Sequence, residues 1–328
     1  MKIQTFFDFC SGIGAGRLGL EQCGLSSVGY SDTSRLSVTT YKMMHSAEEE
    51  KNYGNLKRID GTKLPPYDLL IAGFPCQTFS VIGRKAGFDD SRGQIIFHLI
   101  RLLEECQPKC FILENVRGLV SHDKGATIAK IVEEINKIGY SVEYKVLTSL
   151  NYGVPQMRQR VYFVGFNKNL VSEDAIRNFQ FPEPMSDVPP LSDYLIDTDN
   201  ELSAESMERF RYYLNNPTNQ GKYTPEDFLD EEYLIIDTRM SDLRLYRGKV
   251  PTLRSQRDGI FYVRDGVIRD LTGYEALLLQ GFPKEYADRV KEEVSNRHLL
   301  LQAGNAMTVN VIKALGKAIV NCLGEYDA

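Results

Sequence analysis

Apolar and polar positions alternate in blocks along the first 165 residues, and the blocks have the periods of strands and helices in turn. Short apolar runs predict strands, whereas apolar residues at helical spacing predict helices. The expected strands are 3–8, 68–73, 110–113 and 161–166, and the expected helices are 16–23, 95–105 and 126–138. This alternation predicts an α/β fold with a Rossmann-like, doubly wound, mainly parallel sheet.

The pattern changes after residue 181. Residues 185–265 are acidic, rich in tyrosine and poorly periodic, whereas residues 306–323 again place apolar positions at helical intervals. We therefore expect a catalytic and cofactor-binding domain at 1–174 and a second, smaller domain at 175–290. A C-terminal segment at 291–328 is expected to return to the first domain.

The totals are typical of a soluble globular protein, because 42% of the 328 residues are apolar and 25% are charged. No uninterrupted apolar run reaches the roughly 20 residues that a membrane span needs. We therefore expect a cytoplasmic protein without a membrane partner. The six cysteines form no CxxC pair, so we expect neither a disulfide framework nor a bound metal.

Charge is distributed unevenly, although the net charge is only -5. Residues 172–235 contain 15 acidic and 4 basic side chains, whereas residues 239–269 contain 8 basic and 3 acidic ones. The basic segment, which includes Arg244 and Arg247, is either a local phosphate-binding surface or a solvated charged face. Charge alone leaves both interpretations open.

Three of the expected strands lead directly into residues that suit a binding site, namely Gly12, Cys76 and Glu114. In open α/β sheets, ligands bind at the carboxyl ends of the strands. If the sheet is parallel, these three residues share one edge and line a single cleft.

The stretch GIGAGRLG at residues 12–19 follows a strand and opens a helix. Glycines in such a turn let the backbone approach a nucleotide-like ligand, and Asp32 follows near the spacing of an acid that binds ribose hydroxyls. Glycine turns also occur for packing alone. Asp60 is either a contact to the base end of such a ligand or a plain turn residue.

Cys76 is a candidate nucleophile, although a cysteine in an apolar setting is often only a small buried hydrophobe. The four histidines show no recognisable pairing with it of the kind that a protease needs. Gln156, Arg158 and Arg160 alternate along an expected strand, so all three are expected to face one side. They either face the cleft or have a structural role, as a surface strand edge or in a salt bridge to Glu114.

An ordered series of motifs runs through nearly the whole chain. The motifs are DFCSGIG (8–14), GFPCQTFS (73–80), ENV (114–116), QMRQR (156–160), LQGFP (279–283) and QAGNA (302–306). Together they resemble the DNA (cytosine-5) methyltransferases of bacterial restriction-modification systems. The region at about 172–265 lacks a match, and this is where the family has its variable target-recognition region.

The resemblance implies a fold of the S-adenosylmethionine-dependent methyltransferases. It also implies methyl transfer from S-adenosylmethionine to carbon 5 of a cytosine flipped out of a short, specific sequence in double-stranded DNA. Cys76 is implied to add to carbon 6 of the ring, creating an enamine that attacks the methyl group. Glu114 is implied to bind or protonate ring nitrogen 3, Arg160 to hold the oxygen on carbon 2, and Arg158 to support them.

The same resemblance implies a set of cofactor-binding residues. They are Cys10, Gly12, Ile13, Gly14, Asp32, Thr33, Asp60, Pro75, Asn305 and Ala306. Where this chain has Cys10 and Thr33, the family often has aromatic residues. We therefore expect the cofactor adenine to be packed differently here.

Two segments are implied to contact DNA. The loop at 81–93, with Arg84, Lys85 and Arg92, corresponds to the loop that closes over DNA in the family. In the second domain, Thr252 and Leu253 resemble a Thr-Leu element of family recognition regions, and basic or amide residues follow it. These residues, Arg254, Gln256 and Arg257, contact either base edges or phosphates, and the acidic segment 172–235 is expected to face away from DNA.

Three rival functions remain open. The first is the same reaction on RNA, such as transfer RNA; the second is a nicotinamide-dependent oxidoreductase; and the third is a non-catalytic DNA-binding regulator. The oxidoreductase leaves Cys76 and Glu114 unexplained, and their presence argues against the regulator. The expected partners are double-stranded DNA and a cognate restriction endonuclease acting separately on the same site, and the expected state is a monomer.

Overall fold

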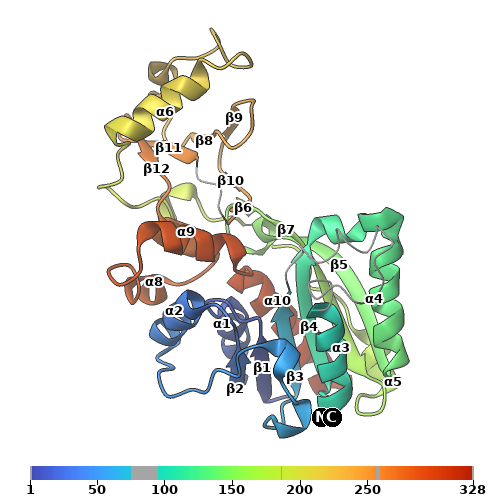
Figure 1. Ribbon diagram of the computed structural model, residues 1–328. Helices are drawn as coiled ribbons and strands as arrows, with labels where there is room; N and C mark the ends of the chain where they lie inside the picture. The colour runs from blue at the N-terminus through green and yellow to red at the C-terminus, as the bar shows by residue number, and fades with distance from the viewer. Residues whose placement is uncertain (1, 75–94, 186, 256–258, 327–328) are drawn as a thin grey trace. The chain divides into compact units, whose positions relative to one another are not determined.

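The computed structural model describes residues 2–74, 95–185, 187–255 and 259–326. The chain divides into two compact units. The first comprises Met1–Thr148, Gln159–Pro184 and Ala306–Ala328, and the second comprises Ser149–Arg158 and Met185–Asn305. Each unit has its own sheet and its own hydrophobic core (Figure 1).

The first unit is built on a six-stranded sheet with the strand order β2-β1-β3-β4-β7-β5. Its strands are β1 (Thr5–Phe9), β2 (Ser26–Ser31), β3 (Leu69–Gly73), β4 (Cys110–Val116), β5 (Tyr140–Thr148) and β7 (Gln159–Asn167). β2, β1, β3 and β4 are parallel, whereas β7 is antiparallel to both β4 and β5. The expected Rossmann-like, mainly parallel sheet is confirmed.

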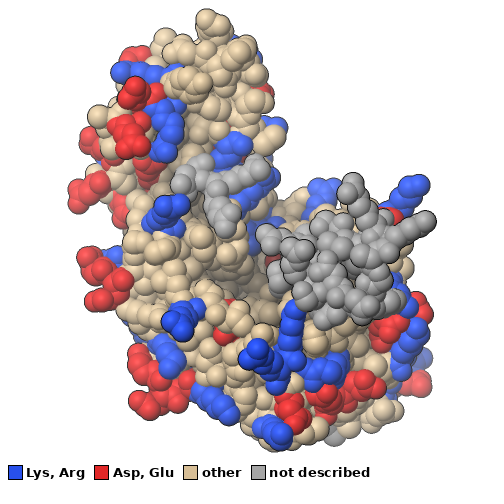
Figure 2. Space-filling model, in the orientation of Figure 1, with Lys and Arg blue, Asp and Glu red and all other residues tan. Residues whose placement is uncertain are grey.

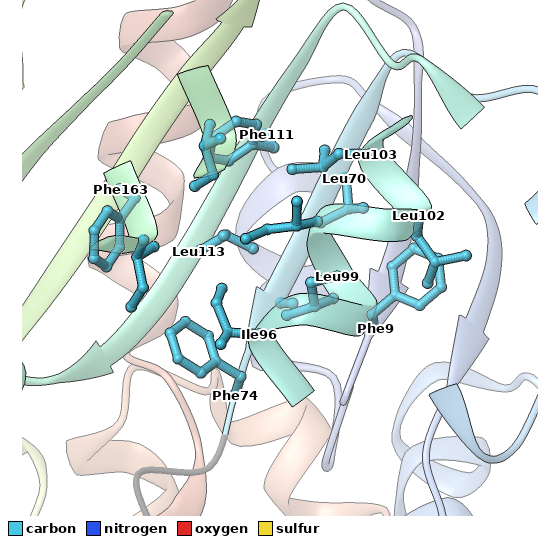
Figure 3. Close-up of a cluster of buried hydrophobic side chains, with 14 of the residues drawn as sticks. Phe9, Leu70, Phe74, Ile96, Leu99, Leu102, Leu103, Phe111, Leu113 and Phe163 are labelled. Atoms are coloured by element: carbon cyan, nitrogen blue, oxygen red, sulfur yellow. The ribbon is translucent and has the colours of Figure 1, made fainter. Parts of the chain in front are cut away.

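One face of this sheet is covered by α3 (Ile95–Cys106) and α4 (Ala126–Lys137). Figure 3 shows Leu70 and Leu113 of the sheet beside Leu99 and Leu103 of α3. These four side chains are fully buried, and each such burial contributes roughly 1.5–3 kcal/mol. The apolar positions of α3 recur at helical spacing, so the helix presents one continuous stripe to the sheet.

The opposite face is covered by α1 (Ala15–Glu21), α5 (Glu173–Asn178) and α10 (Val309–Tyr326). α1 and α10 touch closely at Gly19, where a Cβ atom would lie 2.7 Å from the Cβ of Ile312. The Cys322 thiol donates to the carbonyl of Ala175 at 3.1 Å, which joins α10 to α5. These contacts with α1 and α5 place the C-terminal helix α10 in the first unit. α2 (Arg35–His45) follows β2.

The second unit contains a four-stranded antiparallel sheet in the order β12-β11-β8-β9. Its strands are β8 (Ile235–Asp237), β9 (Arg244–Tyr246), β11 (Ile260–Arg264) and β12 (Val267–Asp270). α6 (Ala204–Leu214) packs on one face, and Phe210 and Leu214 form a core there with Ile236, Phe261 and Val263. A separate parallel pair joins β6 (Gln156–Met157) to β10 (Val250–Pro251).

The remaining helices are short. In the second unit, α7 (Gly273–Leu279), α8 (Lys284–Asp288) and α9 (Asn296–Asn305) follow the antiparallel sheet. The short 3-10 helices of the chain are η1 (Leu56–Arg58), η2 (Gly61–Lys63), η4 (Arg117–Val120), η5 (His122–Gly125), η6 (Ser149–Tyr152), η7 (Leu191–Asp193) and η8 (Pro225–Phe228). α7 and α9 touch at Gly273, where a Cβ atom would lie 2.4 Å from the Cβ of Leu299.

The two units differ from the domain ranges expected from the sequence, 1–174, 175–290 and 291–328, in where the chain passes between them. Residues 175–184 stay with the first unit, since Phe179 packs edge-on against Phe166 of β7. Residues 291–305 stay with the second unit, because α9 packs on α7. Residues 149–158 also belong to the second unit, through contacts described below.

One stretch of the described residues, Asn296–Gly324, is long and apolar enough to cross a membrane by length and composition. It is interrupted between α9 and α10, and 61% of its most apolar window is buried. A core helix of a globular protein passes the same test.

Candidate active site

Glu114 lies near the carboxyl end of β4, where β3 also ends. Gly73 of β3 is its register partner, and the Phe74 amide donates to the Glu114 carbonyl at 3.2 Å. The Asn115 amide group donates to the Phe74 carbonyl at 2.9 Å and is itself buried. These contacts hold Phe74, the residue before Pro75 and Cys76, beside Glu114.

The neighbouring strand brings Arg160 to the same carboxylate. Arg160 lies near the start of β7, opposite Val116 of β4, and its Nε is 2.9 Å from Oε1 of Glu114. The two side chains are only 14% and 10% exposed. The pair is therefore a largely buried cation and anion at a strand edge, which is the kind of group that binds polar atoms of a small planar ligand.

The glycine-rich turn after β1 forms a second cluster in the first unit. Cys10, Gly12 and Gly14 all have left-handed backbone angles, with φ of 51°, 56° and 83°. The Gly12 amide donates to Oδ2 of Asp32 at 2.9 Å, and the Ser34 amide donates to Oδ1 at 2.7 Å. The structure therefore places the glycine turn directly beside the acid at the end of the next strand.

The donor and acceptor set at this turn fits a nucleoside. A Cβ atom on Gly12 would meet nothing within 4 Å, so the space next to the turn is open. Beside it, Asp32 is fixed by two backbone amides, and its pKa is raised chiefly by burial. An anchored carboxylate beside an open glycine turn matches the groups that bind ribose hydroxyls.

Sequence reasoning missed two side chains that support this turn. Asn52 donates to the Asp32 carbonyl at 3.0 Å and accepts from the Asp32 amide at 3.1 Å. A ring nitrogen of His45, Nε2, lies 3.1 Å from the Ile13 carbonyl. No motif or spacing marks either residue, because each reaches the turn only through the packing of the chain between β2 and β3.

The other expected cofactor residues are distributed as follows. Cys10 is half-buried, and burial raises the pKa of its thiol to about 12, so it is a neutral group. Thr33 is exposed. Asp60 caps η2 and pairs with Lys63 at 2.8 Å, and the hydrogen bond from Lys63 lowers its pKa to about 2. Asn305 ends α9 in the second unit, and Ala306 begins the last segment of the first.

Arg158 lies in a different part of the structure from Arg160. β6 ends at Met157 and β7 begins at Gln159, so the strand is interrupted at Arg158. The expectation that Gln156, Arg158 and Arg160 share one face is therefore wrong, since it assumed a continuous strand. Gln156 and Arg158 belong to the second unit, whereas Arg160 belongs to the first.

Within the second unit, Gln156 and Arg158 hold the backbone around Leu253. Gln156 accepts from the Leu253 amide at 3.1 Å and donates to the Leu279 carbonyl at 2.8 Å. Arg158 donates to the carbonyls of Leu253 and Gly304 at 2.9 and 3.3 Å.

The backbone at Gly304 also lies directly against Arg254 and Ser255. These two residues belong to the segment around Thr252 and Arg254, which we call the recognition segment. A Cβ atom on Gly304 would be 2.4 Å from the Ser255 nitrogen, so only glycine permits this approach. We name these contacts, made by Gln156, Arg158 and Gly304 to residues 253–255, the Leu253 clamp. The clamp fixes Thr252 and Arg254, the recognition candidates on either side of Leu253.

The structure divides the basic segment 239–269 into bound and accessible side chains. Arg239 is buried against Asp237 and also donates to the Thr252 carbonyl at 2.8 Å. Arg247 forms an exposed ion pair with Glu231. Arg244 and Arg254 are exposed. Figure 2 shows acidic side chains along one margin of the second unit, with basic side chains further in.

Several expected site residues lie outside the described residues. They are Pro75, Cys76, Arg84, Lys85, Arg92, Gln256 and Arg257. Among the side chains that are described, no group of three or more His, Cys, Asp or Glu residues has a metal-binding arrangement.

Comparisons with known proteins agree with the motif series. Residues 4–321 match the family model described as C-5 cytosine-specific DNA methylase. The chain is 34% identical over 310 residues to the type II methyltransferase M.NgoBI of Neisseria gonorrhoeae, covering 94% of this chain and 91% of that protein. It is 41% identical over 248 residues to the orphan methyltransferase M.Rho11sI of Bacillus phage rho11s, covering 74% and 47%.

A solved structure supports the same fold. The Entamoeba histolytica methyltransferase EhMeth aligns with a TM-score of 0.71 over 98% of this chain and 99% of that one, at 16% sequence identity. At that identity the similarity concerns the fold alone.

Proposed function

This chain belongs to the family of C-5 cytosine-specific DNA methylases, and we propose that its first unit performs the chemistry while its second unit recognises the DNA. It is a DNA cytosine-5 methyltransferase that uses S-adenosylmethionine and acts on double-stranded DNA. The glycine pattern that also suggested a nicotinamide-dependent oxidoreductase therefore belongs here to a methyltransferase.

The pairing of Glu114 with Arg160 is the observation that carries the assignment of roles. Both side chains are largely buried, 2.9 Å apart, next to the strand end that leads to Cys76. When a nucleophile adds to carbon 6 of cytosine, negative charge accumulates on ring nitrogen 3 and on the oxygen of carbon 2. Glu114 must carry a proton for this step: its carboxyl group donates that proton to the nitrogen, and Arg160 donates to the oxygen with a group that does not lose its proton.

Cys76 is the proposed nucleophile. Its thiolate forms a bond to carbon 6, which makes carbon 5 reactive toward a methyl donor. After carbon 5 has gained the methyl group, water takes its proton. The electron pair of that C–H bond re-forms the double bond between carbons 5 and 6, and the bond between sulfur and carbon 6 breaks to restore the thiolate. Arg158 is a positioning residue of the second unit, since its donors are used by Leu253 and Gly304.

The glycine turn and Asp32 are proposed to hold the cofactor. S-adenosylmethionine, when bound, supplies an electrophilic methyl group. Asp32 accepts hydrogen bonds from the ribose hydroxyls, and Gly12 leaves the backbone free of side chains next to the nucleoside. Gly14 is proposed to shape the turn, because a Cβ atom there would lie 2.2 Å from Nε2 of His45. Cys10, Ile13, Thr33, Asn305 and Ala306 are proposed to line the rest of the cofactor site. Asp60 is the weakest member of the set, because its carboxylate is bound by Lys63 and Thr62.

The recognition segment around Thr252 and Arg254 is proposed to read or position the DNA, together with Gln256 and Arg257. Arg84, Lys85 and Arg92 are proposed to contact DNA from the loop that follows Cys76.

Three finer properties are also proposals. The type II relatives suggest a cognate endonuclease that cuts the same site, although a phage relative is named an orphan methyltransferase. We further propose that the enzyme is a monomer and that it works in the cytoplasm. Sedimentation of the enzyme with and without DNA tests the monomeric state.

The first experiment measures methyl transfer from labelled S-adenosylmethionine to a mixed-sequence DNA duplex, followed by sequencing of the methylated cytosines, with transfer RNA in parallel. We expect label at a short recurrent DNA motif. Label in RNA alone would contradict the DNA substrate, and label at scattered cytosines would contradict sequence-specific recognition.

The second experiment tests the nucleophile. Cys76→Ala should lose methylation while still binding a duplex that carries the mapped motif, because the thiolate acts after binding. A duplex with 5-fluorocytosine at the target should become covalently attached to the wild type but not to the variant, since fluorine cannot leave in place of the proton. Substantial turnover by Cys76→Ala would exclude this role.

A further inference from the structure

Several arginine side chains of the second unit form ion pairs or hydrogen bonds with other residues of that unit. Arg239 and Arg247 pair with carboxylates, and Arg269 donates to the Thr198 carbonyl. Arg209, Arg254 and Arg297 differ, because each is exposed and forms no ion pair with any of the described residues. Arg209 donates to the Ser206 hydroxyl at 3.3 Å, which leaves its charge unbalanced.

These three arginines line one hollow of about 500 Å³. They come from three separate segments: α6, the recognition segment after β10, and the first turn of α9. The walls between them include the apolar side chains of Leu253 and Leu271. The carboxylate of Asp270 also lies in the lining and offsets one of the three positive charges.

The backbone that carries the arginines is held firmly at two of the three positions. Arg254 follows Leu253, which the Leu253 clamp fixes at both its amide and its carbonyl. Arg297 is next to Asn296, whose side chain accepts a hydrogen bond from the Gly273 amide. A hollow with fixed walls loses little entropy when a ligand binds, so its shape favours a defined occupant.

Three guanidinium groups around a partly apolar recess repel one another unless an anion lies among them. Guanidinium groups match the fork geometry of phosphate oxygens, and low-dielectric walls strengthen the attraction. We propose that this hollow is a binding site for backbone phosphates of the DNA substrate, an inference that rests on the proposed function. We name it the arginine hollow.

A second, smaller hollow of about 130 Å³ adjoins it through a shared residue. Arg254 lines both hollows, and the smaller one also includes Arg244, Tyr246 and Thr252. A DNA strand that contacts Thr252 in the smaller hollow therefore lies beside Arg254, which also lines the larger one. Phosphates in the arginine hollow position the strand, and the recognition segment remains free to contact bases.

The proposal gives a role to two residues that the sequence did not single out. Arg209 lies in the acidic segment 172–235, which was expected to face away from DNA, and Arg297 lies in the expected C-terminal segment. Neither is close in sequence to the recognition segment, and each reaches the hollow only through the packing of α6 and α9.

The test is the salt dependence of DNA binding by the full chain. The double variant Arg209→Gln/Arg297→Gln is compared with the wild type on a duplex that carries the mapped motif. Each lost phosphate contact should lower the slope of log affinity against log salt by roughly 0.9, so the double variant should lose about twice that. Its preference for the motif over a scrambled duplex should be unchanged, because phosphate contacts carry no sequence information.

The matched control is Arg211→Gln/Arg289→Gln, which removes the same charge from exposed positions of the second unit outside the hollow. Circular dichroism and thermal unfolding confirm that all variants are folded. An unchanged slope in the hollow variant, an equal fall in the control, or a loss of motif preference would each overturn the proposal. Methylation by the wild type is measured on the same duplex, so failure of the proposed function is recorded separately.

Discussion

Replacing Arg158 by methionine removes a guanidinium that joins two backbone segments of the second unit. Arg158 is 2% exposed and donates to the carbonyls of Leu253 and Gly304 at 2.9 and 3.3 Å. Methionine has a long, flexible, apolar side chain that fills similar space. The change therefore removes the two hydrogen bonds that Arg158 makes, to Leu253 and to Gly304, with little loss of packing. The bond between Gln156 and the Leu253 amide remains.

The expected cost follows from these two bonds. A hydrogen bond from a charged donor contributes roughly 1.5–3 kcal/mol, and a buried carbonyl without a partner is costly. The bond of 3.3 Å belongs at the weak end of this range, and removing a buried cation recovers part of its desolvation energy. We expect a net loss of about 3 kcal/mol in the unfolding free energy of the second unit, which is more than a 100-fold change in its equilibrium constant.

Hydrogen exchange read by mass spectrometry suits this test, because it follows the two units separately and the chain contains no tryptophan. In Arg158→Met, amides of residues 250–255 and 300–306 should exchange about 100-fold faster. Arg160→Met is the matched control, since Arg160 pairs with Glu114 in the first unit. It should lower turnover and leave those amides unchanged, so a less than about fivefold change in Arg158→Met, or an equal change in both variants, would refute the clamp.

The remaining predictions concern the chemistry, the cofactor and pH. Glu114→Gln should lower turnover roughly 100-fold while cofactor affinity stays nearly constant, because Glu114 acts as charge develops; equal losses in both would contradict that role. Asp32→Asn should weaken binding of S-adenosylhomocysteine, measured by calorimetry, by roughly 10- to 100-fold, whereas an unchanged Kd would remove Asp32 from the site. Burial raises the pKa of Glu275 to about 7, so the folded state holds this proton more tightly than the unfolded chain, and about 3 kcal/mol of stability present below pH 4.5 is lost as pH rises through 7. Thermal unfolding between pH 5 and 8 should therefore depend less on pH in Glu275→Gln, and an equally steep decline would exclude Glu275 as its cause.

Most elements of the first unit could be predicted from hydrophobic period alone, but two strands could not. β2 reads SSVGYS, in which serine and glycine hide the apolar pattern. β5 is an edge strand whose middle residues, Glu143 to Lys145, are exposed, so it lacks the apolar run of a central strand. The antiparallel direction of β7 was also unpredictable, because period reports which side chains are buried and not which way the strand runs.

The candidate site was predictable in its chemistry and only partly in its geometry. Glu114, Asp32 and the glycine turn were identified from motifs, and the structure pairs Glu114 with Arg160 and Gly12 with Asp32. The assignment of Arg158 to the same face as Arg160 was wrong. The alternating rule applies only within one strand, and the break at Arg158 is not visible in the sequence.

By itself, the sequence determined the family, the reaction and the identity of the candidate reacting groups, because these depend on which side chains occur and in what order. It also determined most of the layered fold, since burial follows residue type. Only the tertiary structure decided which polar groups meet: Gly12 bonds to Asp32 across 20 positions, and Arg158 bonds to Gly304 across 146. A hydrogen bond of about 3 Å between such distant residues depends on strand register and helix packing over the whole unit, and no local pattern of residues encodes that.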